Sequence, residues 1–201
     1  MMLDAGLGTL NYLKSRILPA GAVEVQDWDD ALQRLGKAVA VRMEAFCNRR
    51  FTRSEAHVDE FSALATSIVL RALPVEEITS VEIRSFTGTL TDYEGGWQLD
   101  QRAGLVLFRS IPGDGTERLV VTYAGGYWLD DGSTQPAGST ALPDDLLEAW
   151  VMQCQAWAEA RRLFGTISLA GMENQKSPPS PVHLTAEVTA ILESYRRYSG
   201  E

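Results

Sequence analysis

The sequence is poor in the residue types that build catalytic and metal-binding sites. It contains two histidines and two cysteines among 201 residues. Two cysteines exclude a disulfide framework, and their positions lack the paired spacing of a zinc site. Cys47 and Cys154 each lie among apolar residues in a helical pattern, which predicts reduced, buried side chains. We therefore expect no cofactor and no bound metal.

Basic residues are also scarce. The chain has 18 Lys and Arg against 27 Asp and Glu, which gives a formal net charge of −9. A face that binds nucleic acid normally shows clustered Lys and Arg, so this balance argues against an external face of that kind. A local basic patch is still compatible with the total.

Long apolar runs are missing as well. No stretch approaches the length needed to span a bilayer, and the N-terminal segment MMLDAGLGTLNYLKSR carries Asp4 in place of an uninterrupted apolar core. We expect a soluble, unexported protein that is made in the cytoplasm. With 45% hydrophobic residues, the chain is long enough for one good core, and one domain with an insertion is the simplest organisation.

Apolar residues at helical spacing predict two helices in the first quarter of the chain. The first covers residues 3–17 and ends before Pro19. The second is capped by Asp27 and has Arg49 and Arg50 in its last turn, where cations are favoured. Its apolar stripe comprises Trp28, Leu32, Leu35, Val39, Met43 and Phe46.

Short runs rich in β-branched residues follow from Thr66 to Tyr127. Gly, Asp and Pro clusters separate them, and the clearest turn is RSIPGDGTERL at residues 109–119. This spacing predicts an antiparallel sheet or a small β-sandwich. Gly125 and Gly126 end the last run, where a sharp exit would resist a Cβ atom.

Helical spacing returns at Leu142. We expect Pro143 at the first helical position and Asp144 and Asp145 in the first turn. The apolar stripe comprises Leu146, Leu147, Trp150, Val151, Cys154, Trp157 and Ala158.

A linker rich in Gly, Ser and Pro, residues 165–181, precedes a last short helix that Thr185 caps. An isolated helix of this length is marginal in water, so it needs a surface to pack against, either its own core or another chain.

The search for a chemical site is mostly negative. Neither His57 nor His183 has the spacing that orients a nucleophile or binds zinc, and both are interpreted as surface residues. A metal site of His57 with Asp59 and Glu60 lacks a defined geometry, so a solvated loop is the better interpretation.

Three further groups of residues allow a functional and a structural interpretation. The acids Asp130, Asp131, Asp144 and Asp145 suit calcium or acid–base work, but a solvated loop and a helix N-terminus explain them better. The GLGT segment from Gly6 lacks the strand and the Lys-Ser or Lys-Thr pair of a phosphate loop. Trp150 and Trp157 lie on the helical stripe and are expected in the core, whereas the roles of Trp97 and Trp128 stay open.

Four segments in this order resemble a known family: NRRF from Asn48, LRALPVEEITSV from Leu70, VTYAGGY from Val121 and LPDDLLEAWVMQCQAW from Leu142. The sequence looks like the head-tail connector, or adaptor, proteins of tailed double-stranded DNA bacteriophages and gene transfer agents. The resemblance covers most of the chain. It differs in the stretch WLDDGSTQPAGSTA, which is longer than such a link needs, and in the proline-rich linker.

The resemblance implies an α+β fold, in which a helical bundle carries an inserted antiparallel β-sheet or small β-sandwich. We expect N-terminal helices over residues 1–65, the β region over 66–127, a loop and long returning helix over 128–165, and a linker with a C-terminal helix over 166–201.

It also implies a structural virion protein at the portal vertex. Such subunits form a ring, usually dodecameric, between the portal protein and the tail terminator or stopper, and DNA passes through the ring without specific binding. An acidic subunit suits that passage, because affinity for phosphates requires Lys and Arg contacts. The C-terminal segment would dock on the portal through Val188, Ile191, Leu192, Tyr195, Arg196 and Arg197.

Two alternatives remain from the sequence. One is a small carbohydrate-binding module or hydrolase that uses Trp97, Trp128 and the neighbouring acids. The other is a different neck protein or a tail-completion protein.

Overall fold

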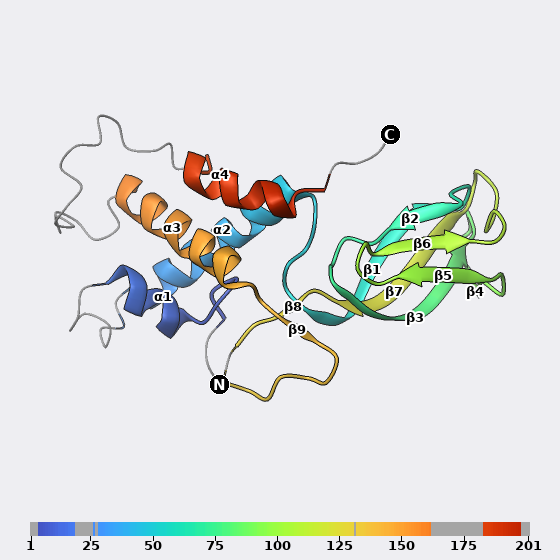
Figure 1. Cartoon of the computed structure of the whole chain (residues 1–201). Coiled ribbons are helices and arrows are strands. Elements are labelled where there is room, and N and C mark those ends of the chain that lie inside the picture. The colour runs from blue at the N-terminus through green and yellow to red at the C-terminus, as the bar shows by residue number, and fades with distance from the viewer. Residues whose placement is uncertain (1–3, 19–25, 27, 131, 162–182, 198–201) are drawn as a thin grey trace. The chain divides into compact units, whose positions relative to one another are not determined.

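The protein combines helices with antiparallel sheets, which confirms the predicted α+β class (Figure 1). The computed structural model describes residues 4–18, 26, 28–130, 132–161 and 183–197. Contacts divide the chain into a helical unit, residues 1–48, 129–134 and 142–201, and a β unit, residues 49–128 and 135–141. Within the described residues, none of the helices has the length and apolar character required to cross a bilayer.

The helical unit is built on two long helices. Its elements are α1 (Leu10–Ile17), α2 (Asp29–Cys47), α3 (Asp144–Ala160) and α4 (Ala186–Leu192), which continues into a 3₁₀ turn (Glu193–Tyr195). α2 and α3 pack on each other, and both contact α1 and α4. The predicted stripes on α2 and α3 supply the core between these helices.

A close backbone approach fixes the centre of the helical unit. The Trp150 Nε1 donates a hydrogen bond of 2.9 Å to the Gly36 carbonyl oxygen. A Cβ at position 36 would lie 2.1 Å from the Ala5 carbonyl oxygen, so only glycine fits there. The buried Lys14 Nζ also contacts an Asp29 carboxylate oxygen at 2.6 Å, which joins α1 to α2.

The helix ends differ from the prediction in three places. α1 begins at Leu10, because Gly6 takes a φ of +121° and the Thr9 hydroxyl caps the helix. α2 ends at Cys47, because Asn48 adopts a left-handed conformation (φ 49°), so Arg49 and Arg50 follow the helix. Pro143 is the N-cap of α3, one residue before the helix starts. The predicted cap Asp27 lies outside the described residues.

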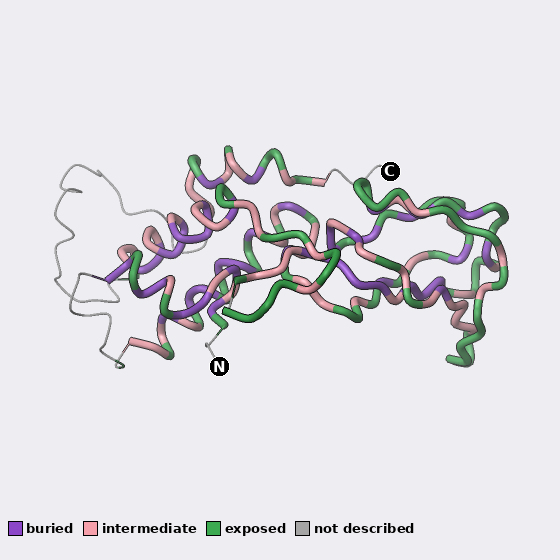
Figure 2. The backbone as a smooth tube through the Cα atoms, turned by 60° about the horizontal axis from the view of Figure 1, so that its bottom comes forward, coloured by how far each residue is buried: buried purple, intermediate pink, exposed green. Residues whose placement is uncertain are grey.

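The β unit contains two antiparallel sheets with one shared core. Its strands are β1 (Ser54–Ser62), β2 (Ser67–Val69), β3 (Val75–Arg84), β4 (Leu90–Asp92), β5 (Trp97–Asp100), β6 (Leu105–Phe108) and β7 (Arg118–Gly125). One sheet has the order β1-β7-β3-β4 and the other β2-β6-β5. Buried residues of both sheets form a single cluster. Figure 2 colours the backbone of buried residues purple, and such segments alternate with exposed ones along the strands. A short parallel pair, β8 (Tyr127–Trp128) and β9 (Thr140–Ala141), completes the unit.

The expected start of the β region at Thr66 was wrong. β1 begins at Ser54, so residues 54–62 are a strand and do not belong to N-terminal helices. Its sequence, SEAHVDEFS, is mostly polar, because β1 is an edge strand and only Asp59 is fully buried. Val58 is the one β-branched residue of the strand, so the signal on which the prediction depended is weak there.

The predicted need for glycine at the end of β7 was confirmed. A Cβ on Gly125 would lie 2.8 Å from the Ala72 carbonyl oxygen. Gly126 has a φ of +95°, and a Cβ there would lie 2.6 Å from the Thr52 carbonyl oxygen. The chain then continues as β8.

A buried hydrogen-bond network ties β7 to β1. The Tyr123 hydroxyl donates to the Asp59 Oδ2 at 2.7 Å and accepts from the backbone N–H groups of Ala72 at 2.9 Å and Arg71 at 3.1 Å. Burial raises the pKa of Tyr123, so the phenol stays protonated and can donate.

We predict that Tyr123→Phe lowers the stability of the β unit by about 1–3 kcal/mol, because it removes the donor to Asp59 and the acceptor of the buried Ala72 N–H. Thermal unfolding followed by circular dichroism measures this change. Tyr93→Phe is the matched control, since its hydroxyl makes only longer, exposed contacts to Ser110 at 3.3 and 3.4 Å. Equal stability of the two variants would contradict the role of the network.

Candidate interaction surfaces

The two histidines lie in different settings. His57 was expected on a solvated loop, but it lies half-buried in β1, with its ring 5.5 Å from that of Tyr123. Its Nε2 contacts the Thr52 carbonyl oxygen at 3.2 Å. Burial and the nearby Arg50 cation lower the pKa of His57 and favour the neutral ring. His183 is exposed, as predicted.

The candidate acidic groups also serve local structure. Asp130 accepts a hydrogen bond from the Gly132 N–H within a turn, and Asp131 lies outside the described residues. Asp144 and Asp145 occupy the first turn of α3, as predicted. Among the described parts of the chain, no group of three His, Cys, Asp or Glu residues has the arrangement to hold a metal ion.

The four tryptophans considered above lie in three different settings. Trp150 and Trp157 are buried on α3, which confirms their predicted place in the core. Trp97 pairs with Phe108 near the start of β7, whereas Trp128 follows the opposite end of β7. Trp97 and Trp128 therefore do not form one platform for a sugar ring.

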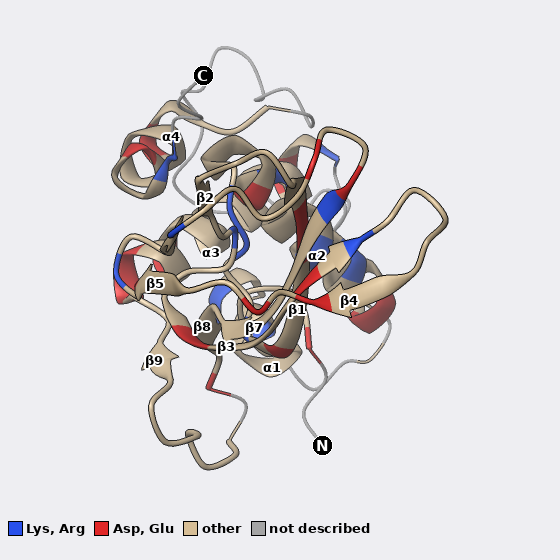
Figure 3. Ribbon diagram, turned by 90° about the vertical axis from the view of Figure 1, so that its right-hand side faces the viewer, with Lys and Arg blue, Asp and Glu red and all other residues tan. Residues whose placement is uncertain are grey.

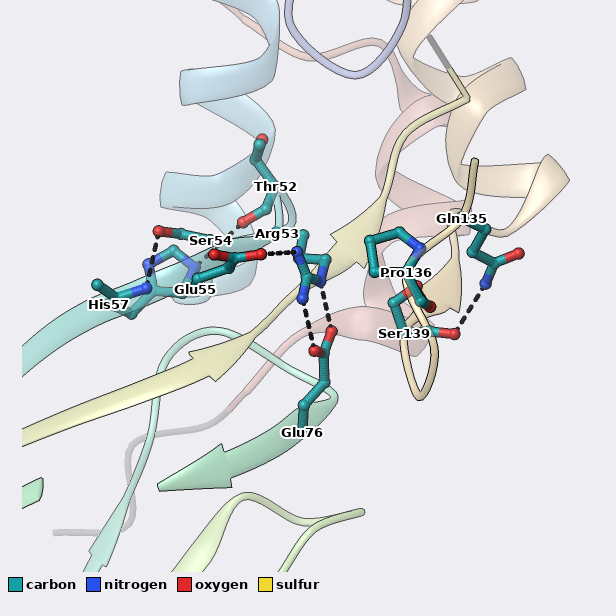
Figure 4. Close-up of polar contacts among 10 residues, drawn as sticks. Thr52, Arg53, Ser54, Glu55, His57, Glu76, Gln135, Pro136 and Ser139 are labelled. Carbon is teal, nitrogen blue, oxygen red and sulfur yellow. Dashed lines mark hydrogen bonds and ion pairs between the residues drawn. The ribbon is translucent and has the colours of Figure 1, made fainter. Parts of the chain in front are cut away.

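A polar groove of about 770 Å³ lies in the β unit. It is lined by residues from β1, β3, the β5–β6 turn and the segment before β9, among them Arg53, Glu76, Arg102 and Gly138. Figure 4 shows how the Arg53 guanidinium meets the Glu76 carboxylate through two bonds, at 2.7 and 2.9 Å. These bonds raise the pKa of Arg53, so the cation and the carboxylate are held together as a closed pair.

The segment beside the groove is held by its own contacts. The Gln135 Nε2 donates to the Ser139 carbonyl oxygen at 2.8 Å, and the Ser139 hydroxyl donates to the Pro136 carbonyl oxygen at 2.8 Å (Figure 4). The groove is lined mainly by charged and polar side chains, with the Arg53–Glu76 pair among them.

One end of the β unit gathers exposed apolar side chains. Where β1, β3 and β6 end and β7 begins, large hydrophobic residues are exposed, and we call them the apolar end: Leu64, Phe86, Leu90 and Ile111. Phe86, at the tip of the β3–β4 hairpin, is 91% exposed. Hydrogen bonds among Ser85, Thr87 and Thr89 order this tip. Clustered exposed apolar residues on an ordered scaffold are typical of a surface that binds another protein.

The predicted portal-binding residues divide into two sets. Val188 and Leu192 are fully buried in the helical unit, so the last helix packs through them on its own core, one of the two surfaces that the sequence left open. They are on the side of α4 that packs against α2 and α3. The other four remain at least partly accessible: Ile191, Tyr195, Arg196 and Arg197.

Contacts at both ends hold α4 in place. At its start, the buried Gln153 Oε1 accepts a hydrogen bond from the Thr185 N–H at 2.9 Å. The His183 carbonyl oxygen accepts two more hydrogen bonds, from the Gln153 Nε2 at 3.3 Å and from the Trp157 Nε1 at 3.1 Å. At its end, the Tyr195 hydroxyl donates to the Asp145 Oδ1 at 2.6 Å. The buried amide of Gln153 is a signal that the sequence pattern did not reveal, because it interrupts an otherwise apolar stripe.

We predict that Gln153→Leu loosens α4, because it leaves the Thr185 N–H without its buried acceptor and removes one donor to the His183 carbonyl. Hydrogen exchange across residues 185–192 should become roughly tenfold to a hundredfold faster, equivalent to about 1.4–2.8 kcal/mol. Gln155→Leu is the control, since that exposed amide bonds the Arg16 carbonyl on α1. Unchanged exchange in Gln153→Leu would refute the role of Gln153.

The comparisons with known proteins bear on the fold. No family model and no curated protein matches the sequence. Among solved structures, a chain from the neck of an empty GTA particle, computed with C6 symmetry, has a TM-score of 0.61 at 17% identity, covering 96% of this chain and 90% of that chain.

Two further structures agree with it. A chain from the virion of a native gene transfer agent (GTA) particle has a TM-score of 0.61 at 15% identity, covering 100% of this chain and 96% of that chain. A chain from the neck of a native GTA particle, computed with C12 symmetry, has a TM-score of 0.55 at 16% identity, covering 100% and 97%. The fold of this chain is therefore similar, over nearly its whole length, to the folds of chains from GTA necks and virions.

Proposed function

We propose that this protein is a structural subunit of the neck of a phage-like particle, and that it acts there as the head-tail adaptor. The observation that carries the proposal is fold similarity to GTA neck and virion chains that extends over at least 96% of this chain and 90% of each compared chain. A similarity of that extent includes both units, not one common module.

The division of the chain supports the same proposal. The helical unit is assembled from segments on both sides of the β unit, as in the predicted helical bundle with an inserted β region. We interpret the helical unit as that bundle and the β unit as the insertion. The compared particles were computed with C6 and C12 symmetry, which favours a closed ring, and we propose a dodecamer.

Two surfaces are available for the other neck proteins. We assign the end of the C-terminal segment to the portal protein, through Ile191, Tyr195, Arg196 and Arg197, with Val188 and Leu192 holding the helix in place. The apolar end of the β unit is assigned to the tail terminator or stopper, because such a contact would cover Phe86. A net charge of −9 favours passage of DNA without tight binding.

We predict that the purified protein forms closed rings in negative-stain electron micrographs, and that an antibody against it labels the neck of particles from the cells that encode it. The fold similarity and the exposed apolar end are the physical reasons. A protein that stays monomeric at every concentration and is missing from purified particles would overturn the proposed function.

We also predict that the double variant Arg196→Glu and Arg197→Glu weakens binding to purified portal protein at least tenfold in a sedimentation assay, because it reverses two charges at the proposed contact. Arg102→Glu, on an exposed turn of the β unit, is the control and should bind like the wild type. If both variants bind equally well, the portal contact lies elsewhere on the molecule.

A further inference from the structure

The outward face of α2 is basic in a protein that is acidic overall. Arg34, Lys37 and Arg42 are exposed there, spaced so that they share one side of the helix. Between Arg34 and Arg42 the helix has no acidic residue. Ala38, Val41 and Ala45 are exposed on the same side, and the acidic Asp30 and Glu44 lie at its two ends, outside the stretch from Arg34 to Arg42.

The basic side chains on this face of α2 form few ion pairs with other described residues of the chain. Lys37 contacts an Asp4 carboxylate at 3.6 Å, with both side chains about half exposed or more. In the part of the chain that the structure describes, Arg34 and Arg42 form no ion pair, whereas Arg16 and Arg84 each meet a glutamate. Val41 is 64% exposed, the largest exposure of a big hydrophobic residue on α2. The face therefore combines unused positive charge with uncovered apolar surface.

The outward face of α4 has the opposite character. Val188 and Leu192 are buried on one side of this helix, and Glu187, Ala190 and Glu193 are exposed on the other. Glu187 has no ion pair among the described residues, and Glu193 pairs with the neighbouring Arg196 at 3.0 Å. Figure 3 colours the basic residues of α2 and the acidic residues of α4.

The charged stretches of the two faces have comparable lengths. Arg42 follows Arg34 by eight positions, about 12 Å along a helix, and Glu193, in the 3₁₀ turn after α4, follows Glu187 by six positions, about 9 Å. Small residues lie between the charges on both helices, so that the helix axes can approach closely, as in ordinary helix packing. Opposite charges at both ends of a contact set its register and its choice of partner.

The two faces cannot meet within one chain. α4 packs on α2 through its other side, where the Cys47 Sγ contacts the Leu192 carbonyl oxygen at 3.6 Å and the Cys47 carbonyl oxygen accepts from the Arg197 N–H at 2.9 Å. Contact between the outward faces therefore needs a second copy of the chain.

We infer that the outward face of α2 in one copy binds the outward face of α4 in the next copy. This inference rests on the proposed function and names the contact between subunits. The two faces are different surfaces of one protomer, so the contact is heterologous and can repeat from copy to copy until it closes a ring. A nucleic acid is the competing occupant of the basic face, and the acidic total charge disfavours it.

The test uses charge reversal of whole faces in the full chain. One variant carries Arg34→Glu, Lys37→Glu and Arg42→Glu, and the other carries Glu187→Arg and Glu193→Arg. Each variant alone presents faces of like charge, so assembly should weaken at least tenfold in native mass spectrometry and light scattering. An equimolar mixture should assemble again, because each altered face then meets an oppositely charged face of the other variant.

Controls separate this inference from folding and from the proposed function. Circular dichroism must show that both variants fold, and Arg102→Glu, outside both faces, must assemble like the wild type. If the wild type forms no oligomer, the proposed function fails. If the wild type and both variants form the same ring, the ring stands and this contact is wrong. A third outcome favours nucleic acid: the wild type binds duplex DNA, the triple variant does not, and both assemble equally. That result would overturn the inference.

Discussion

The β unit depends on the buried hydroxyl of Tyr123. That single oxygen joins β7 to Asp59 of β1 and to the backbone at Arg71 and Ala72, three segments that are distant in the sequence. These bonds hold residues 71–72, which precede β3, against the end of β7. The close approach of Gly125 to the Ala72 carbonyl oxygen becomes possible only in that arrangement, and it leaves no room for a side chain.

The sequence predicted the parts of the fold that follow from periodicity. The stripes of α2 and α3 were correct because each long helix buries a wide apolar side. β1 was missed because an edge strand needs few apolar residues, and its one fully buried residue is the charged Asp59. Helix ends were displaced at Gly6 and Asn48, where the backbone conformation is decided by residues that carry no hydrophobic signal.

The candidate surfaces were harder to predict, for a different reason. The pattern Val188, Ile191, Leu192 and Tyr195 does mark one side of a helix, but a sequence does not state whether that side meets its own core or another chain. Burial of Val188 and Leu192 answers this for two of them. The total charge likewise does not tell where charges of each sign lie on the surface. The chain has a net charge of −9, yet Arg34, Lys37 and Arg42 are exposed together on one side of α2.

The anchoring of His183 by Gln153 and Trp157 has a mechanical consequence. α3 runs to Ala160, and His183 is bonded to side chains of that same helix. A force that pulls on α4 from its N-terminal side is therefore carried first by these bonds to α3, and α4 can detach from its seat only after they break.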